Sequence, residues 1–191
     1  MVQKIPEVLI YEMVDGIPIY YKGYREYLEG AIQIEEITGS SYLQALLGTE
    51  LVILLSRLLD MSKYRIMSNE IGLKFAKGSW RAADLVVYEK SKLKGIAIDN
   101  KYLEVAPEIV IEIDTKANLE EVENPLGYYQ EKTDQLLEFG VQKVVWIFTE
   151  TQKVMIAEDR DNWQIVSWHK ELEIMDGVQV NIQELILEAE K

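Results

Sequence analysis

Two acidic side chains stand beside strongly apolar runs of the sequence, and this placement is the first indication of chemistry. Asp84 precedes Leu85-Val86-Val87, and Glu112 follows Ile109-Val110-Ile111. Such runs are typical of strands buried on both faces, which hold the side chains at their ends more tightly than loops do. Two carboxylates placed this way suit a hard divalent cation such as Mg²⁺. Alternatively, both acids cap strand ends by hydrogen bonds to the backbone.

Ionisable residues near Glu112 could complete such a site. Asp114 and Lys116 follow it in the same stretch, and Lys132 lies in a later predicted helix. A lysine can orient the attacking water or offset charge that develops in the transition state. Alternation along a strand would put Glu112, Asp114 and Lys116 on one face only if the strand continued that far.

The elements that must position these residues follow from apolar periodicity and turn signals. Residues 7–14 and 17–21 around Asp15-Gly16 favour an N-terminal hairpin, and Pro18 favours an edge position for its second strand. Helical spacing from Tyr42 to Leu59 predicts a helix that Ser40 or Ser41 can cap. Further strands are predicted at 64–70, 71–75, 82–88, 141–148, 153–157 and 163–168, a short extended region at 173–174, and helices within 23–39, at 125–139 and at 182–190.

The order strand, helix, glycine, strand between residues 107 and 148 predicts a βαβ crossover. The central sheet is therefore expected to be parallel or mixed. With 191 residues and no low-complexity linker, we expect one mixed α/β domain spanning 1–191. The chain has no cysteine, which excludes disulfides and thiolate metal sites. Neither an export signal nor 18 consecutive apolar residues is visible, so we expect a cytoplasmic protein with no membrane partner.

The charge of the chain is strongly acidic, with 20 basic and 33 acidic residues and a net charge of −13. This balance argues against broad non-specific adhesion to nucleic acid. Residues 51–100 differ, because nine Lys and Arg residues there exceed five acids. This basic quarter either presents phosphate-binding charge on one face or consists of ordinary solvated side chains.

The motifs that carry these acids resemble the PD-(D/E)XK nuclease superfamily and, more narrowly, the Uma-type bacterial family of restriction endonucleases. The resemblance rests on the lone Asp of 83–87, on Pro107-x-apolar-apolar-apolar-Glu112 with Thr115 three residues later, and on the run 132–147 with its Gly-Val and Trp-bearing strand. It implies a restriction-endonuclease-like fold of the α/β (α+β) class, with a mixed central sheet flanked by helices. It also implies hydrolysis of DNA phosphodiester bonds that depends on Mg²⁺, with Mn²⁺ as an alternative ion.

The resemblance also assigns roles to individual residues. Asp84 and Glu112 match the two metal-binding acids of the family. The superfamily's simple pattern has lysine where this chain has Asp114, so we favour Lys132, which occupies the place of the family's lysine, as the catalytic lysine. Lys116 is the rival.

Two further acids are candidate metal ligands beside Asp84 and Glu112. They are Asp114 and Glu50, the latter because the superfamily often draws an extra acid from the first long helix. Such enzymes often act as homodimers, which we expect here. The alternative is a binding or regulatory module with a nuclease fold and no catalytic activity.

Overall fold

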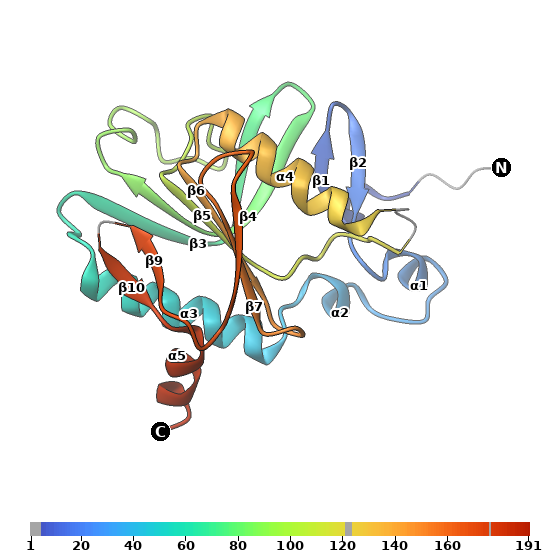
Figure 1. Cartoon of the computed structure of the whole chain (residues 1–191). Coiled ribbons are helices and arrows are strands. Elements are labelled where there is room, and N and C mark those ends of the chain that lie inside the picture. Colours follow the sequence, from blue (N-terminus) through green and yellow to red (C-terminus); the bar gives the residue numbers. More distant parts are fainter. Residues whose placement is uncertain (1–4, 121–123, 176) are drawn as a thin grey trace.

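The computed structural model describes residues 5–120, 124–175 and 177–191. Strands and helices follow one another along the chain in a mixed order (Figure 1). The strands are β1 (Ile10–Val14), β2 (Ile17–Tyr20), β3 (Tyr64–Ala76), β4 (Ser79–Glu89), β5 (Ile109–Ile113), β6 (Lys143–Phe148), β7 (Lys153–Ala157), β8 (Trp163–Ser167), β9 (Leu172–Met175) and β10 (Val178–Val180). The helices are the 3₁₀ turn η1 (Glu7–Leu9) and α1 (Tyr24–Leu28), α2 (Ile34–Thr38), α3 (Tyr42–Leu58), α4 (Pro125–Phe139) and α5 (Ile182–Ala189).

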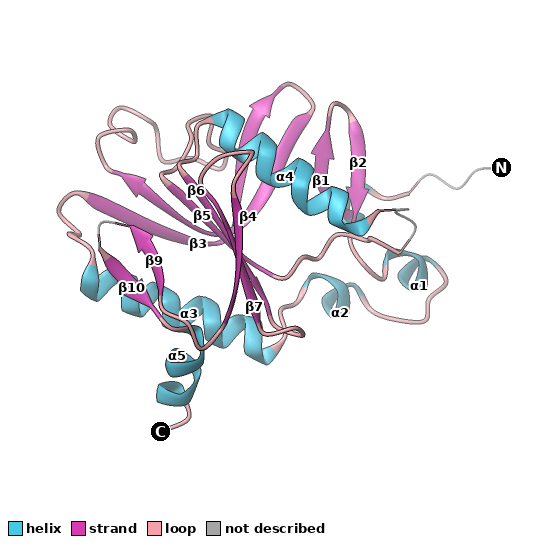
Figure 2. Ribbon diagram, in the orientation of Figure 1, coloured by secondary structure: helices cyan, strands magenta, loops and turns pink. Residues whose placement is uncertain are grey.

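The central sheet is mixed, as the sequence predicts. Its strands follow the order β2-β1-β4-β5-β6-β7-β8, with β3 also paired to β4. β5 and β6 run parallel and are joined through α4, which confirms the predicted crossover. The other pairs in this sheet are antiparallel, and β2 is an edge strand, as Pro18 indicates. Figure 2 shows the sheet with helices on both sides.

Helices cover the two faces of the sheet because successive strand residues alternate between two apolar cores. Leu85 and Val87 of β4 pack in one core with the buried leucines of α3. Val86 and Tyr88 pack in the other core with Leu136 of α4. The central strands are therefore buried on both faces, in agreement with their unbroken apolar runs.

Helix α3 forms where the sequence predicts it. Ser41 accepts a hydrogen bond from the backbone N–H of Gln44, and the Gln44 side chain accepts one from the N–H of Ser41, which together make a capping box. Buried Leu47, Leu51 and Leu55 form one stripe of the helix at a spacing of four residues. This anchoring fixes the opposite stripe of α3, which borders the cleft described below.

Two elements differ from the prediction. Residues 64–76 form one strand, β3, rather than two, and a bulge interrupts it at Asn69 and Glu70. The short region expected at 173–174 is a strand of the β9–β10 hairpin. In the described part of the chain, no helix is both long and apolar enough to span a bilayer.

Candidate active site

Two strands, β1 and β5, share one edge of β4 and leave a gap between them. Strand β3 pairs along nearly the whole length of β4, so β1 and β5 must share its other edge. On that edge β1 pairs at Trp80 and β5 pairs at Leu85–Val87. The backbone groups of Ala82, which lies between these two pairings, form hydrogen bonds with side chains. The N–H of Ala82 donates to Glu12 Oε1 at 3.2 Å, and its carbonyl accepts from Lys132 Nζ at 2.8 Å. Charged groups thus occupy the gap between the two strands.

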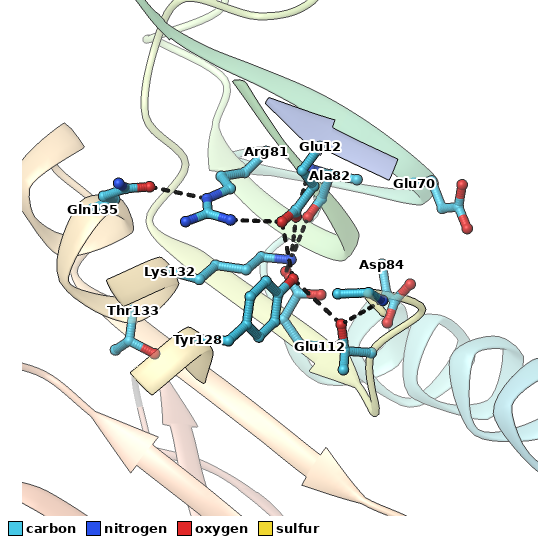
Figure 3. Close-up of polar contacts among 12 residues, drawn as sticks. Glu12, Glu70, Arg81, Ala82, Asp84, Glu112, Tyr128, Lys132, Thr133 and Gln135 are labelled. Atoms are coloured by element: carbon cyan, nitrogen blue, oxygen red, sulfur yellow. Dashed lines mark hydrogen bonds and ion pairs between the residues drawn. The ribbon is translucent and has the colours of Figure 1, made fainter. Parts of the chain in front are cut away.

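Four charged side chains meet in this gap, and we call them the gap cluster: Glu12, Arg81, Glu112 and Lys132. Lys132 Nζ lies 2.8 Å from Glu12 Oε1 and 3.1 Å from Glu112 Oε1, and Arg81 NH1 donates to Glu12 Oε2 at 2.8 Å (Figure 3). All four residues have a relative exposure of 0%. Buried charges of this kind persist only when they are paired, and here two formal positive charges meet two negative ones.

The two carboxylates of the gap cluster differ in how they are held. Burial opposes ionisation of Glu12, but the charges of Lys132 and Arg81 outweigh it and lower the pKa of Glu12. Burial raises the pKa of Glu112 well above its usual range, and the charge of Lys132 only partly opposes this. Within the described residues, neither oxygen of Glu112 accepts a hydrogen bond of good geometry. Glu112 is therefore the member with free lone pairs.

Lys132 remains a cation in this surrounding. Burial alone would lower its pKa, but Glu112 and Glu12 together raise that pKa above the usual lysine value. The ammonium also lies near the rings of Tyr11 and Trp146, at 5.6 and 5.3 Å from their centroids. Lys132 is thus a permanently charged group, enclosed and fixed from several sides.

Asp84 lies at the side of the gap that opens to solvent. Its Oδ2 accepts a hydrogen bond from the N–H of Ile113 at 2.7 Å, which ties β4 to the end of β5. Burial raises the pKa of Asp84, against the effect of this hydrogen bond and of Lys132. The charge of Asp84 in turn contributes to the raised pKa of Glu112, so the two predicted metal-binding acids are electrostatically coupled.

A cleft of about 660 Å³ lies beside Asp84, between α3 and the middle of β3. Its charged lining residues are Asp84, Glu70 and Lys116. Lys116 pairs with Glu70 and donates to the carbonyl of Thr38 at 3.0 Å. The remaining lining residues are Tyr11, Thr38, Ser40, Gln44, Ala45, Gly48, Thr49, Val52, Ile53, Ser68, Asn69, Ile113 and Thr115.

Tyr11 connects the cleft with the gap cluster. It lines the cleft, and Lys132 lies over its ring at 5.6 Å from the centroid. The cleft and the gap cluster are therefore neighbours rather than separate sites.

The bulge in β3 sets the position of Glu70. Ser68 pairs with Leu85 and Ile71 pairs with Ala83, so Asn69 and Glu70 together lie opposite Asp84. Both bulge residues have positive φ angles, 84° for Asn69 and 53° for Glu70, which L-residues rarely adopt. A strained backbone at this point brings a second carboxylate, beside that of Asp84, to the cleft wall.

The structure brings the predicted site residues together in two groups. Glu112 and Lys132 belong to the gap cluster, and Asp84 and Lys116 line the cleft. Lys132 is fully buried, whereas the Lys116 side chain is 16% exposed. The two candidate lysines are thus both present but face different surroundings.

Asp114 belongs to neither group, although its neighbours Ile113 and Thr115 line the cleft. Strand β5 ends at Ile113, and Asp114 has a φ of 59°, so the alternation that would align it with Glu112 and Lys116 stops there. Its carboxylate instead accepts hydrogen bonds from the N–H of Thr149 at 2.8 Å, from the Thr149 hydroxyl at 2.6 Å and from Gln44 Nε2 at 3.3 Å. These bonds account for Asp114 as a structural residue.

Glu50 also lies outside the cleft lining. It is half-buried on α3, whose cleft-facing residues include Ala45, Gly48 and Thr49. Glu50 lies next to the lining residues Thr49 and Ile53 on the helix, but it does not line the cleft itself. Asp84 and Glu112 therefore remain the candidate donors for a cation.

These donors fit a hard divalent cation in their chemistry. Asp84 offers a carboxylate at the cleft wall, and Glu112, apart from its ion pair with Lys132, accepts no hydrogen bond of good geometry from the described residues. Within the described residues no three His, Cys, Asp or Glu side chains gather closely enough to form a complete metal cage. Mg²⁺ commonly uses one or two carboxylates, with water and substrate phosphate as the other ligands, so two acids suffice.

Sequence reasoning missed Glu12 and Arg81. The available signal was a lone acid inside the apolar run Ile10-Tyr11-Glu12-Met13-Val14 and a cation three residues before Asp84. A charged residue at the buried face of a strand requires a partner of opposite sign. Its identity depends on which strands meet, and that information is not local to either segment.

The basic quarter does not line the cleft. None of its nine Lys and Arg residues borders the cleft among the described residues. Arg81 is buried in the gap cluster, and Lys74 and Lys92 pair with Glu104 and Glu108. The local excess of positive charge in the sequence is thus partly neutralised in the fold.

Comparisons with known proteins agree with this architecture. The crystal structure of a putative nuclease belonging to DUF820 from Anabaena variabilis ATCC 29413 is similar in fold, with a TM-score of 0.66 and 15% sequence identity over 92% of this chain and 89% of that one. No curated protein matches the chain. The model of the Uma2 family, described as "Putative restriction endonuclease", matches residues 23–187. Because this match covers most of the 191 residues, the chain belongs to the Uma2 family.

Proposed function

We propose that this protein is a divalent-cation-dependent endonuclease that hydrolyses DNA phosphodiester bonds. The observation that carries the proposal is the arrangement at the gap in the sheet: Asp84 lies at the cleft wall, and Glu112 and Lys132 of the gap cluster lie beside it, close enough to affect its charge (Figure 3). Membership of the Uma2 family supports a nuclease function, and the cleft is the natural place for a phosphodiester.

Asp84 and Glu112 would hold Mg²⁺ or Mn²⁺ with their carboxylate oxygens. Such an ion polarises a phosphate and lowers the pKa of bound water. Lys132 donates to the carbonyl of Ala82 and pairs with Glu112, so it fixes the Glu112 side chain relative to β4. Lys116 supplies the positive charge that faces the cleft and can contact a substrate phosphate once its bond to Glu70 is released.

The two candidate lysines thereby receive different roles. Lys132 is completely enclosed and acts through Glu112 as a positioning residue. Lys116 lies in the cleft and can stabilise negative charge on the scissile phosphate directly. This division fits both residues better than the choice of one as the catalytic lysine.

A second candidate function is that of a binding module with this fold and no hydrolysis. The full burial of Glu112 and its absence from the cleft lining favour this alternative. The net charge of −13 also opposes tight binding of a polyanion. The nuclease proposal accordingly requires that a cation offset the charges of Asp84 and Glu112 when DNA binds.

The test is cleavage of supercoiled plasmid by the purified protein and by Glu112→Ala, with Mg²⁺, with Mn²⁺ and with EDTA. We expect cation-dependent cleavage by the wild type and a loss of at least about 100-fold in Glu112→Ala, since removal of a metal-binding acid removes charge stabilisation worth several kcal/mol. Linear rather than nicked product would indicate that two copies act together, as in a homodimer. An inactive wild type, or an equally active Glu112→Ala, would leave the binding module as the function.

A further inference from the structure

Glu12 and Glu112 share Lys132 but have opposite hydrogen-bond surroundings. Glu12 receives the Arg81 guanidinium, the Tyr128 hydroxyl at 2.9 Å, the N–H of Ala82 and the Lys132 ammonium. Glu112 has the ion pair with Lys132 and accepts no hydrogen bond of good geometry from the described residues. One carboxylate is fully satisfied, and the other keeps its lone pairs available.

Formal charges explain why both carboxylates are needed. Without Glu12, Arg81 would keep the exposed Glu131, and Lys132 would have Glu112 as its single buried counter-ion, so Glu112 would be held by Lys132 rather than by a divalent cation. With Glu12 present, Arg81 and Lys132 have a permanent partner, so Glu112 can direct an oxygen elsewhere. Mutation of a residue that orients a metal-binding side chain commonly lowers the metal affinity of the site.

We propose that Glu12 is a positioning residue of the nuclease site. It fixes Lys132 and balances Arg81 and Lys132, which leaves the Glu112 carboxylate free to bind a divalent cation. This inference rests on the nuclease function proposed above. Glu12 itself is enclosed, does not line the cleft and makes no contact with the substrate.

Glu12 lies in a part of the chain that the family match does not cover. The family match begins at residue 23, whereas Glu12 lies on β1 of the N-terminal hairpin. Strand β1 reaches the site because it pairs with β4 at Trp80. The hairpin is therefore a working part of the site rather than an appendage to the family domain.

A purely structural role is the competing explanation, because removal of one member of any buried ion pair is destabilising. Glu108 provides a matched control. It is 4% exposed, pairs with Lys92 at 2.7 Å and accepts a hydrogen bond from the N–H of Glu89 at 2.6 Å. It does not line the cleft. Glu108→Gln and Glu12→Gln each remove one buried, paired carboxylate.

The experiment measures Mn²⁺ affinity by calorimetry, kcat and KM for plasmid cleavage, and Tm. In Glu12→Gln we expect Mn²⁺ affinity and kcat to fall about tenfold or more, with the KM for DNA little changed. In Glu108→Gln we expect a lower Tm with unchanged Mn²⁺ affinity and kcat. If Glu12→Gln and Glu108→Gln had the same Mn²⁺ affinity and the same kcat, the positioning role would be overturned, while the nuclease function would stand.

A double variant keeps the inference testable if Glu12→Gln does not fold. Glu12→Gln with Arg81→Gln removes one charge of each sign, so the gap cluster remains balanced and should fold. Lys132 then has Glu112 as its one remaining buried carboxylate, and we expect Mn²⁺ affinity to stay about tenfold low. Wild-type affinity in the double variant would overturn the inference. A wild type that neither binds Mn²⁺ nor cleaves DNA would overturn the proposed function itself, and with it the positioning role of Glu12.

Discussion

At the scale of single residues, Glu112 combines complete burial with a carboxylate that accepts no hydrogen bond of good geometry from the described part of the chain. Its pKa is raised by burial, whereas a carboxyl in the unfolded chain ionises near pH 4.3. Between those two values the unfolded chain has lost this proton and the folded chain retains it. Stability must therefore fall as the pH rises through this window. Glu12 has a lowered pKa, so its contribution is complete above the usual carboxyl pKa and is lost only in acid.

The replacement Glu112→Gln should cost the cation-free protein little stability near neutral pH, because an amide needs no proton uptake on folding and this offsets the loss of the ion pair with Lys132. The variant should also lose the fall in stability with rising pH above about 4.3. Urea unfolding at pH 5 and at pH 7 measures both effects. Glu108→Gln, which loses its partner Lys92 without such an offset, should be destabilised more strongly. If the stability of Glu112→Gln depended on pH as strongly as that of the wild type, the raised pKa of Glu112 would not be the cause of this pH dependence.

At the scale of elements, the bulge in β3 determines what the cleft contains. Asn69 tolerates its φ of 84° because its short polar side chain is among the few that enter the left-handed region. Asn69→Val should cost about 1–2 kcal/mol, whereas Asn69→Gly should be close to neutral. Chemical denaturation of the two variants gives the comparison. Equal stability would mean that the bulge can relax without strain.

The sequence predicts the elements whose signals are local. Helix α3 begins at its capping box, α4 ends at Gly140, and the apolar runs at 82–88 and around Ile109–Ile113 are the buried strands β4 and β5. The bulge was not predicted, because the break of alternation at Asn69-Glu70 is equally typical of two separate strands. The turn at Asp114 was missed for a similar reason: one left-handed residue ends β5 without a glycine or proline signal.

The candidate site was predictable only in part. Asp84, Glu112 and the two lysines follow from motif order, but their division between cleft and gap cluster depends on the pairing of β1, β4 and β5. Glu12 and Lys132 belong to segments far apart in the sequence, and no local pattern joins them. Burial of one charge indicates that a partner exists, while tertiary structure alone identifies it.

At the scale of the whole molecule, the acidic surface limits how DNA can bind. Lys116 is the sole cationic lining residue of the cleft in the described chain, beside the acids Glu70 and Asp84. In the proposed nuclease, few lysine-to-phosphate contacts would mean little counter-ion release, so the orientation of DNA would have to come from a bound divalent cation and from polar groups of the cleft.

DNA affinity measured with Ca²⁺ should therefore depend weakly on salt, with a slope of log K against log salt of about −1 to −2. Lys116→Met should make this slope less negative by about one unit, since one phosphate contact is lost. Lys74→Met, which removes a surface cation paired with Glu104, is the matched control and should change it little. Fluorescence anisotropy of a labelled duplex gives the slopes, and a value steeper than about −4 would reveal a basic surface elsewhere.

The members of the gap cluster lie far apart in the sequence, and this determines when during synthesis the site can first form. The bond from Tyr128 to Glu12 joins residues 116 positions apart, and both Tyr128 and Lys132 lie on α4. During synthesis from the N-terminus, the hairpin and the β3–β4 pair are complete well before α4 has been made. Until α4 docks, Glu12 and Arg81 have no Lys132 and Glu112 has no counter-ion. Nascent chains and fragments that stop before α4 should therefore lack nuclease activity, so that cleavage competence appears only after the parallel pairing of β5 and β6 is complete.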